Sequence, residues 1–153
     1  DVEDDEEFQI RSYRSPENIL GIKYSKRSES WAVGCVLWDI LTTDCLFEPN
    51  LKQKNIDKDR EQLALMEKYL GKISKDITME CPRTWELYED SGKIIKNKKV
   101  KRVELDNLLR EKRPDLLDEE INNLCRFLKK TWYYNYSSRL TPEELLKDEF
   151  LTI

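Results

Sequence analysis

Residues 28–42 read SESWAVGCVLWDILT, a stretch of helical length that is apolar on almost every side. A helix without a polar face belongs in the interior of a domain. Its longest apolar run, Trp31 to Trp38, is far too short to span a bilayer and is closed by Asp39. The sequence therefore predicts one buried central helix, with the rest of the chain packed around it and no membrane partner.

Other segments show apolar residues at helical spacing. The expected helices cover residues 60–70, 85–88, 103–111 and 118–132, and a last helix begins at Thr141. Asp118 is expected to cap the helix over 118–132, and Thr141 the last one, because Pro142 and Glu144 complete a capping box. Residues 44–58 read as a polar connection, and no strand pattern of comparable quality occurs. The predicted fold class is all-α.

Composition excludes several classes of function. Charged residues make up 38% of the 153 residues and aromatic residues 10%, which is consistent with one folded domain. A net charge of −4 gives no support for direct nucleic-acid binding. The acidic run at 1–7 and the lysine-rich run at 93–102 read as solvated loops. Four separated cysteines and no histidine predict no metal site and a reducing compartment, cytoplasmic or nuclear.

Three separated segments together resemble one family. Residues 11–17, RSYRSPE, resemble the T-R-x-Y-R-[AS]-P-E end of the activation segment in protein kinases of the CMGC group. Residues 29–34, ESWAVG, resemble the D-x-W-S-x-G start of the central kinase helix. Residues 139–141, RLT, with Leu145 and Phe150, resemble the R-x-[ST]…L…[WF] sequence that closes a kinase domain. The resemblance implies the C-terminal lobe of a eukaryotic-type protein kinase.

The same resemblance assigns roles to residues. It implies that residues 1–27 end the activation segment and that 28–153 form a helical lobe with an insert at about 44–115. It pairs Glu17 with Arg139 in a buried ion pair. The remaining implied roles are substrate positioning for Ile10, Arg11, Tyr13 and Arg14, and support of the catalytic loop for Glu29 and Trp31.

Within this group the chain is most similar to the SR-protein kinases. Residues 44–49, DCLFEP, resemble the segment after the central helix of that family, and residues 61–72 resemble its next helix. The resemblance implies Arg/Ser-rich protein substrates and a candidate docking groove that contains Asp44 and Glu61. Lys68 stands where that groove would have another acid. The alternative is that Asp44 and Glu61 are ordinary surface acids.

Two substitutions and several absences depart from the kinase pattern. Ile10 stands where the family has Thr, and Glu29 where it has Asp. The chain contains no G-x-G-x-x-G, no H-R-D and no D-F-G, the motifs that hold ATP and Mg²⁺ and supply the base. We expect the chain alone to be inactive. In a full-length parent, the missing N-lobe and catalytic loop would bind ATP and Mg²⁺.

Three functional hypotheses remain open at this stage. The first is a fragment of an active serine/threonine kinase, consistent with a first residue that is Asp rather than Met. The second is a pseudokinase or truncated lobe that binds proteins as a scaffold. The third is an unrelated helical interaction domain, in which Glu17 and Arg139 would not meet. If the lobe is isolated, we expect exposed apolar surface near Trp31 and Ile10 and therefore marginal stability or self-association.

Overall fold

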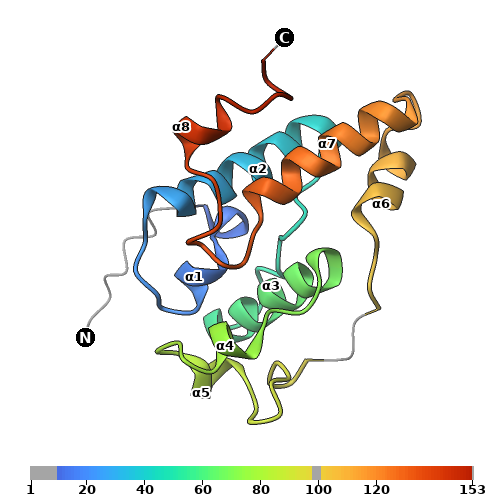
Figure 1. The fold of residues 1–153 in the computed structure, drawn as a ribbon. Coiled ribbons are helices and arrows are strands. Elements are labelled where there is room, and N and C mark those ends of the chain that lie inside the picture. The colour runs from blue at the N-terminus through green and yellow to red at the C-terminus, as the bar shows by residue number, and fades with distance from the viewer. Residues whose placement is uncertain (1–9, 98–100, 153) are drawn as a thin grey trace.

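In the described part of the chain, residues 10–97 and 101–152 of a computed structural model, the regular elements are helices joined by loops (Figure 1). Within these ranges the only extended pairing is an isolated bridge between Tyr88 and Ile94. The all-α prediction is confirmed. In chain order the helical elements are the 3-10 turn η1 (Arg11–Tyr13), α1 (Pro16–Ile19), α2 (Lys26–Thr42), α3 (Asn55–Leu70), α4 (Lys75–Thr78), α5 (Thr84–Leu87), α6 (Leu105–Lys112), α7 (Asp118–Thr131) and α8 (Pro142–Leu145).

The long helix α2 is the predicted central helix. Ser25 caps its first turn by accepting a hydrogen bond from the amide of Arg27, and Ser28 completes a capping box. The helix ends at Thr42 because Thr43 turns into the left-handed region, with φ of 61°. In Figure 1, α2 and α7 lie side by side above α3, and α6 joins the far end of α7.

Aromatic rings from three segments form the centre of the core. Trp31 of α2 is fully buried, and its ring centroid lies 5.4 Å from that of Phe47 in the loop after α2. Trp132, at the end of α7, packs edge-on against Phe47 at 5.3 Å and also meets Trp38 at 6.4 Å. Aromatic pairs at such separations stabilise by about 0.5–1.5 kcal/mol beyond the area they bury. The loop containing Phe47 is therefore part of the core.

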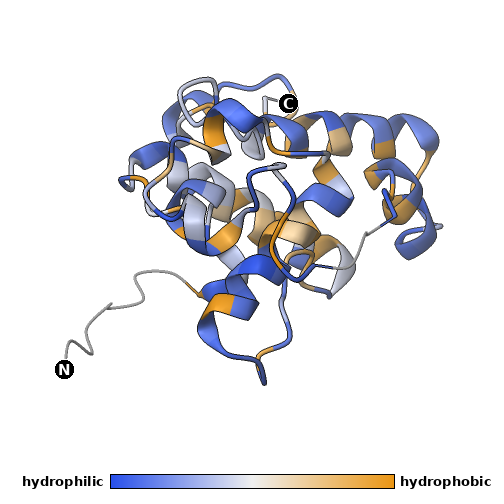
Figure 2. Ribbon diagram, turned by 90° about the horizontal axis from the view of Figure 1, so that it is seen from below, coloured by the Kyte–Doolittle hydropathy of each residue, from blue (hydrophilic) through white to orange (hydrophobic). Residues whose placement is uncertain are grey.

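One side of α2 does not follow the sequence expectation. Val33, Val36 and Ile40 lie on the same side of the helix and are exposed, Ile40 to 73%. The prediction of a helix buried all round is wrong for this side, because no described element of the chain covers it. Trp31 is buried, as expected of the central helix, and Ile10 is exposed to 67%. Figure 2 shows that hydrophobic and hydrophilic residues alternate along the helices of the chain.

Three helix boundaries and faces differ from the sequence prediction. Helix α3 begins at Asn55, before the predicted start at residue 60. Leu117, not Asp118, precedes the first turn of α7, and its amide donates to the Glu120 carboxylate at 2.7 Å. Asp118 is instead the first residue of α7 and pairs with Arg110 at 3.0 Å. The last helix ends at Leu145, and Leu146, the next residue, is exposed.

The last helix keeps its predicted cap. Thr141 accepts a hydrogen bond from the Glu144 amide at 3.2 Å, and the Glu144 carboxylate accepts one from the Thr141 amide at 2.7 Å. Beyond α8, Phe150 stacks on Phe127 with centroids 5.0 Å apart, which fixes the segment after the helix on α7. None of the helices in the described ranges has the length and apolarity that crossing a bilayer requires.

Helix α2 lies in close contact with the end of α7 at Gly34. A Cβ atom added there would lie 2.7 Å from Nε1 of Trp132 and would overlap the side chain of Thr131. Both neighbours are buried, so they have little room to move.

We expect Gly34→Ala to destabilise the protein by about 1–3 kcal/mol, the usual cost of forcing extra volume into a packed core. Urea unfolding monitored by tryptophan fluorescence measures the change. Ala32→Gly, also on α2, is the control for the helix propensity of the two residues. Equal stability of Gly34→Ala and the wild type would show that α2 and α7 do not meet closely here.

A second prediction follows from the exposed side of α2. We expect the chain to self-associate at micromolar concentrations, because contiguous exposed apolar side chains seek partners. Replacing Val36 and Ile40 together by glutamate should shift the sedimentation profile to monomer, with little change in the free energy of unfolding. Leu51→Glu, an exposed apolar residue outside α2, is the control. A wild type that is monomeric at all concentrations would contradict this prediction.

Candidate functional site

A buried ion pair joins the start and the end of the described chain. The Arg139 guanidinium donates from Nη1 to Oε1 of Glu17 at 2.6 Å and from Nη2 to Oε2 at 2.9 Å. Arg139 is fully buried and Glu17 almost so. This is the two-pronged geometry that gives arginine–carboxylate pairs their strength and direction. Glu17 lies in α1, directly after η1, so the pair fixes the base of the segment that precedes α1.

Every N–H group of the Arg139 guanidinium has an acceptor. The remaining three donate to main-chain carbonyls, two to Tyr133 at 2.9 and 2.7 Å and one to Arg27 at 2.9 Å. The guanidinium also lies 5.2 Å from the ring centroid of Trp31. A buried charge is tolerated only when it is paired and hydrogen-bonded throughout. Arg139 meets this condition and links the start of α2 to the turn after α7.

The carboxylate of Glu17 is held in its charged form. Burial opposes the charge, but hydrogen bonds from Arg139 and from the Ser28 hydroxyl, at 2.7 Å, outweigh it and lower the pKa of Glu17 below its ordinary value. A lowered pKa in the folded state stabilises the fold above the unfolded-state pKa of 4.5. This contribution is lost as the pH falls through the folded-state value.

The turn η1 contacts two long helices. From its first residue, the Arg11 side chain reaches Asp59 of α3 at 2.6 Å, and the Arg11 carbonyl accepts a hydrogen bond from Nε2 of Gln62 at 2.7 Å. From its last residue, the Tyr13 hydroxyl donates to Asp39 of α2. The hydrogen bond to Asp39, with burial, raises the pKa of Tyr13 to about 12. The turn is thus fixed to α2 and α3 at separate points.

The other residues assigned to the substrate loop and its support are placed differently. Ile10 is largely exposed, and Arg14 continues from η1 in extended backbone, its amide donating to the Arg11 carbonyl at 3.0 Å. Glu29 lies in the first turn of α2 with its side chain in solvent. Trp31, two residues on, is part of the core. The structure therefore separates Glu29 from the contacts that fix η1.

The two acids assigned to a docking groove both have partners within the chain. Asp44 forms an ion pair with Lys112 at the end of α6. Glu61 accepts a hydrogen bond from the amide of Asn50 at 3.0 Å. Lys68, at the position where an acid was expected, lies 5.0 Å above the ring of Tyr69. No contact between Asp44 and Glu61 occurs among the described residues.

Sequence reasoning missed four polar residues that shape this site. They are Ser28, Asp39, Asp59 and Arg83, which contact Glu17, Tyr13, or each other. One signal was available for Asp59, because it precedes Leu63 and Met66 by four and seven residues and so shares the buried side of α3. Among the described residues, no group of three or more His, Cys, Asp or Glu side chains is placed to hold a metal ion.

We expect Glu17→Gln to destabilise the protein by about 3–5 kcal/mol, because it leaves the Arg139 charge buried without its partner. The wild type should lose stability as the pH falls below 4.5, whereas the variant should lose less over the same range. Urea midpoints between pH 3 and 7, which span the ordinary range of carboxyl pKa values, measure both effects.

The control is Glu143→Gln, which removes an exposed carboxylate 3.3 Å from Lys26 and should leave the urea midpoint nearly unchanged. Equal losses from the two substitutions would show that the buried pair is not a major contributor to stability.

Comparison with known proteins supplies the family. Residues 4–151 match the protein kinase domain family. The relatives include the serine/threonine-protein kinase SRPK of Physarum polycephalum, 27% identical over 95% of this chain and 34% of that protein. They also include the dual specificity protein kinase lkh1 of Schizosaccharomyces pombe, 30% identical over 93% of this chain and 20% of that protein.

A third relative, the serine/threonine-protein kinase spk-1 of Caenorhabditis briggsae, is 27% identical over 95% of this chain, which covers 13% of it. The chain thus spans about a third or less of the length of these three relatives. The relatives are kinases of the CMGC type, as the sequence motifs indicated. The chain belongs to the protein kinase domain family, and its helical fold is that of the C-terminal lobe.

Proposed function

We propose that this chain is the substrate-side part of a serine/threonine protein kinase. In the full-length protein it would position the loop from Ile10 to Arg14 beside the protein substrate. The observation that carries this proposal is the buried pair of Glu17 and Arg139, which lies directly after that loop and fixes its end. Contacts from Tyr13 to α2 and from Arg11 to α3 support the same role.

The reaction proposed for the full-length protein is phosphoryl transfer from ATP with Mg²⁺. A bond forms between the substrate hydroxyl oxygen and the γ-phosphorus while the bond to the β,γ-bridging oxygen breaks, and the hydroxyl proton passes to a base. No residue of this chain is assigned to nucleotide, metal or base, because the sequence contains none of the corresponding motifs. The contribution of this chain is positioning, which can account for a large share of catalysis.

The exposed side of α2 is a surface on which the rest of such a kinase can pack. Val33, Val36 and Ile40 form an apolar strip that is exposed in the described structure. Covering these three side chains would contribute favourably, at about 25 cal/mol for each Å² of apolar surface buried. We propose that the remainder of the kinase domain packs on this strip.

Arg/Ser-rich proteins are the substrate class that we propose. The support is similarity to a kinase named SRPK and the sequence resemblance that assigns Asp44 and Glu61 to a docking groove. The ion pair between Lys112 and Asp44 opposes docking of a basic peptide, because a substrate arginine must displace the lysine. The proposed affinity for such peptides is therefore lower than two free carboxylates would give.

A second candidate function is a protein-binding scaffold without phosphoryl transfer. Two observations favour it: Ile10 removes the hydroxyl expected in the substrate loop, and the Glu29 side chain extends into solvent. In a scaffold, the exposed apolar strip on α2 would bind a partner protein instead of the rest of a kinase domain. The two functions differ in one measurable property, the transfer of phosphate by the full-length protein.

The test uses the full-length natural protein with Mg²⁺, radiolabelled ATP and a serine peptide rich in arginine. We expect label on serine in the wild type. Asp44→Asn with Glu61→Gln should raise the KM for the peptide, and Lys112→Met should lower it by freeing Asp44, each by several-fold, since single charge contacts contribute about 1 kcal/mol. The KM for ATP should not change.

A peptide with each arginine replaced by glutamine is the matched control for charge, and Glu111→Gln, next to Lys112, is the control variant. A wild type that binds the arginine peptide without labelling it would favour the scaffold. Equal labelling of both peptides would leave the kinase function standing and contradict the Arg/Ser-rich substrate class.

A further inference from the structure

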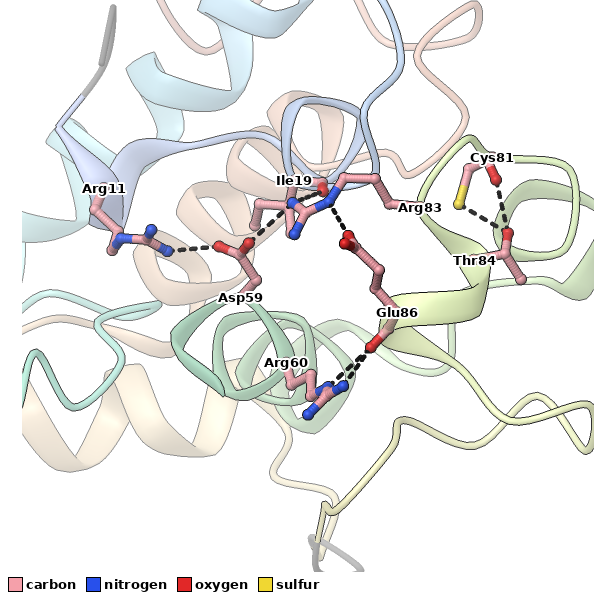
Figure 3. Close-up of polar contacts among 8 residues, drawn as sticks. All are labelled: Arg11, Ile19, Asp59, Arg60, Cys81, Arg83, Thr84 and Glu86. Atoms are coloured by element: carbon pink, nitrogen blue, oxygen red, sulfur yellow. Dashed lines mark hydrogen bonds and ion pairs between the residues drawn. The ribbon is translucent and has the colours of Figure 1, made fainter. Parts of the chain in front are cut away.

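One carboxylate of α3 lies between two guanidinium groups from distant segments (Figure 3). Asp59 accepts from Nη1 of Arg11 through Oδ1 at 2.6 Å and from Nη1 of Arg83 through Oδ2 at 2.9 Å. Asp59 is only 5% exposed, and the Arg11 side chain is also nearly buried. Each oxygen of the carboxylate thus serves a different cation. We refer to Arg11, Asp59 and Arg83 as the Asp59 clamp.

Arg83 connects the clamp to two further elements. Its Nη1 also donates to the carbonyl of Ile19, the last residue of α1, at 2.8 Å, and its Nε donates to Glu86 of α5 at 2.7 Å. Burial alone would lower the pKa of Arg83, but its hydrogen bonds to the carboxylates of Glu86 and Asp59 raise it, so the charge is retained. Arg83, in the segment after α3, therefore holds a permanent positive charge in contact with both Asp59 and the end of α1.

The clamp fixes the side chain of Arg11, and a neighbouring contact fixes the main chain of the same residue. The Gln62 amide, one turn after Asp59 on α3, donates to the Arg11 carbonyl at 2.7 Å. Side chains from two successive turns of α3 thus contact both the main chain and the guanidinium of Arg11. Such paired contacts define the position and the orientation of η1 relative to α3.

We propose that Asp59 is a positioning residue for the substrate loop, a role that rests on the proposed kinase function. Without its charge, two guanidinium groups would face each other in a buried site with no anion between them. Arg11 would move to solvent, because its segment begins at the exposed Ile10, and η1 would move with it. The contact from Arg60 to the Glu86 carbonyl, at 3.0 and 2.6 Å, remains and keeps α5 on α3.

The first experiment measures hydrogen exchange of η1 in the chain described here. The amides of Tyr13 and Arg14 donate to the carbonyls of Ile10 and Arg11, at 2.9 and 3.0 Å, and so report on whether the turn is formed. Asp59→Asn should raise their exchange rates by about tenfold or more, while amides of α7 keep theirs. Unchanged rates at Tyr13 and Arg14 would overturn the proposal.

The matched control is Asp57→Asn, which removes a more exposed carboxylate of the same helix, paired with Arg60 at 3.1 Å. It should leave exchange at η1 unchanged. If Asp59→Asn does not fold, Arg11→Met removes the same ion pair without altering α3 and should raise the exchange rates at η1 by itself. Exchange at the wild-type rate in Arg11→Met would contradict the proposal.

A double-substitution cycle separates positioning from a general structural role. In the Arg11→Met background, Asp59→Asn should add little further exchange at η1, because the guanidinium that it releases is already absent. If the two substitutions act additively on η1, Asp59 stabilises the fold without acting through Arg11, and the proposal fails.

The second experiment measures kinetics in the full-length protein with Mg²⁺, ATP and the arginine-rich peptide. Asp59→Asn should raise the KM for the peptide by about tenfold and leave the KM for ATP unchanged. Asp59→Glu, which keeps the negative charge, should raise the KM for the peptide by less. An active wild type with no change in peptide KM in the variant overturns the positioning role alone. An inactive wild type with faster η1 exchange in Asp59→Asn overturns the kinase function alone.

Discussion

The guanidinium of Arg139 is the point on which the arrangement of the lobe depends. Removing an arginine and a glutamate from water costs several kcal/mol per ion, so their attraction stabilises the fold only when every donor and acceptor is satisfied. The carbonyls of Tyr133 and Arg27 and the hydroxyl of Ser28 complete the set. These groups belong to the turn after α7 and to the start of α2. If either segment shifted, Arg139 or Glu17 would lose one of its hydrogen-bond partners while remaining buried.

The two ionic sites of the structure act on the same short segment from opposite sides. The Glu17 pair fixes α1 to α2, while the Asp59 clamp fixes η1 and the end of α1 to α3. Between them, the aromatic core of Trp31, Phe47 and Trp132 keeps the distance between α2 and α7 constant. A loop of low intrinsic helical content thus acquires one defined conformation. Its rigidity comes from long-range charge contacts and not from local propensity.

Local patterns predicted the parts of this fold that local physics determines. The central helix α2, the amphipathic α7 and the Thr141 cap follow from apolar spacing and from contacts between residues three or four apart. The exposed side of α2 was not predictable, because an apolar side chain does not specify which element covers it. Helical spacing could have placed Asp59 on the buried side of α3, but its partners lie 48 and 24 residues away, and no local pattern identifies them.

The separation between Glu17 and Arg139 has a consequence for biosynthesis. The two residues are 122 positions apart, so the glutamate leaves the ribosome long before the arginine that neutralises it. At about 5–20 residues per second, several seconds pass in which α1 has no partner for its charge. During that interval α2 can form, because its cap and helical contacts are local, but packing α1 on it would bury the Glu17 charge without its cationic partner. The Glu17–Arg139 pair therefore forms late in the folding of the lobe. A polypeptide whose synthesis stopped before Arg139 would expose the start of α2 and an unpaired carboxylate to the chaperones of the cell.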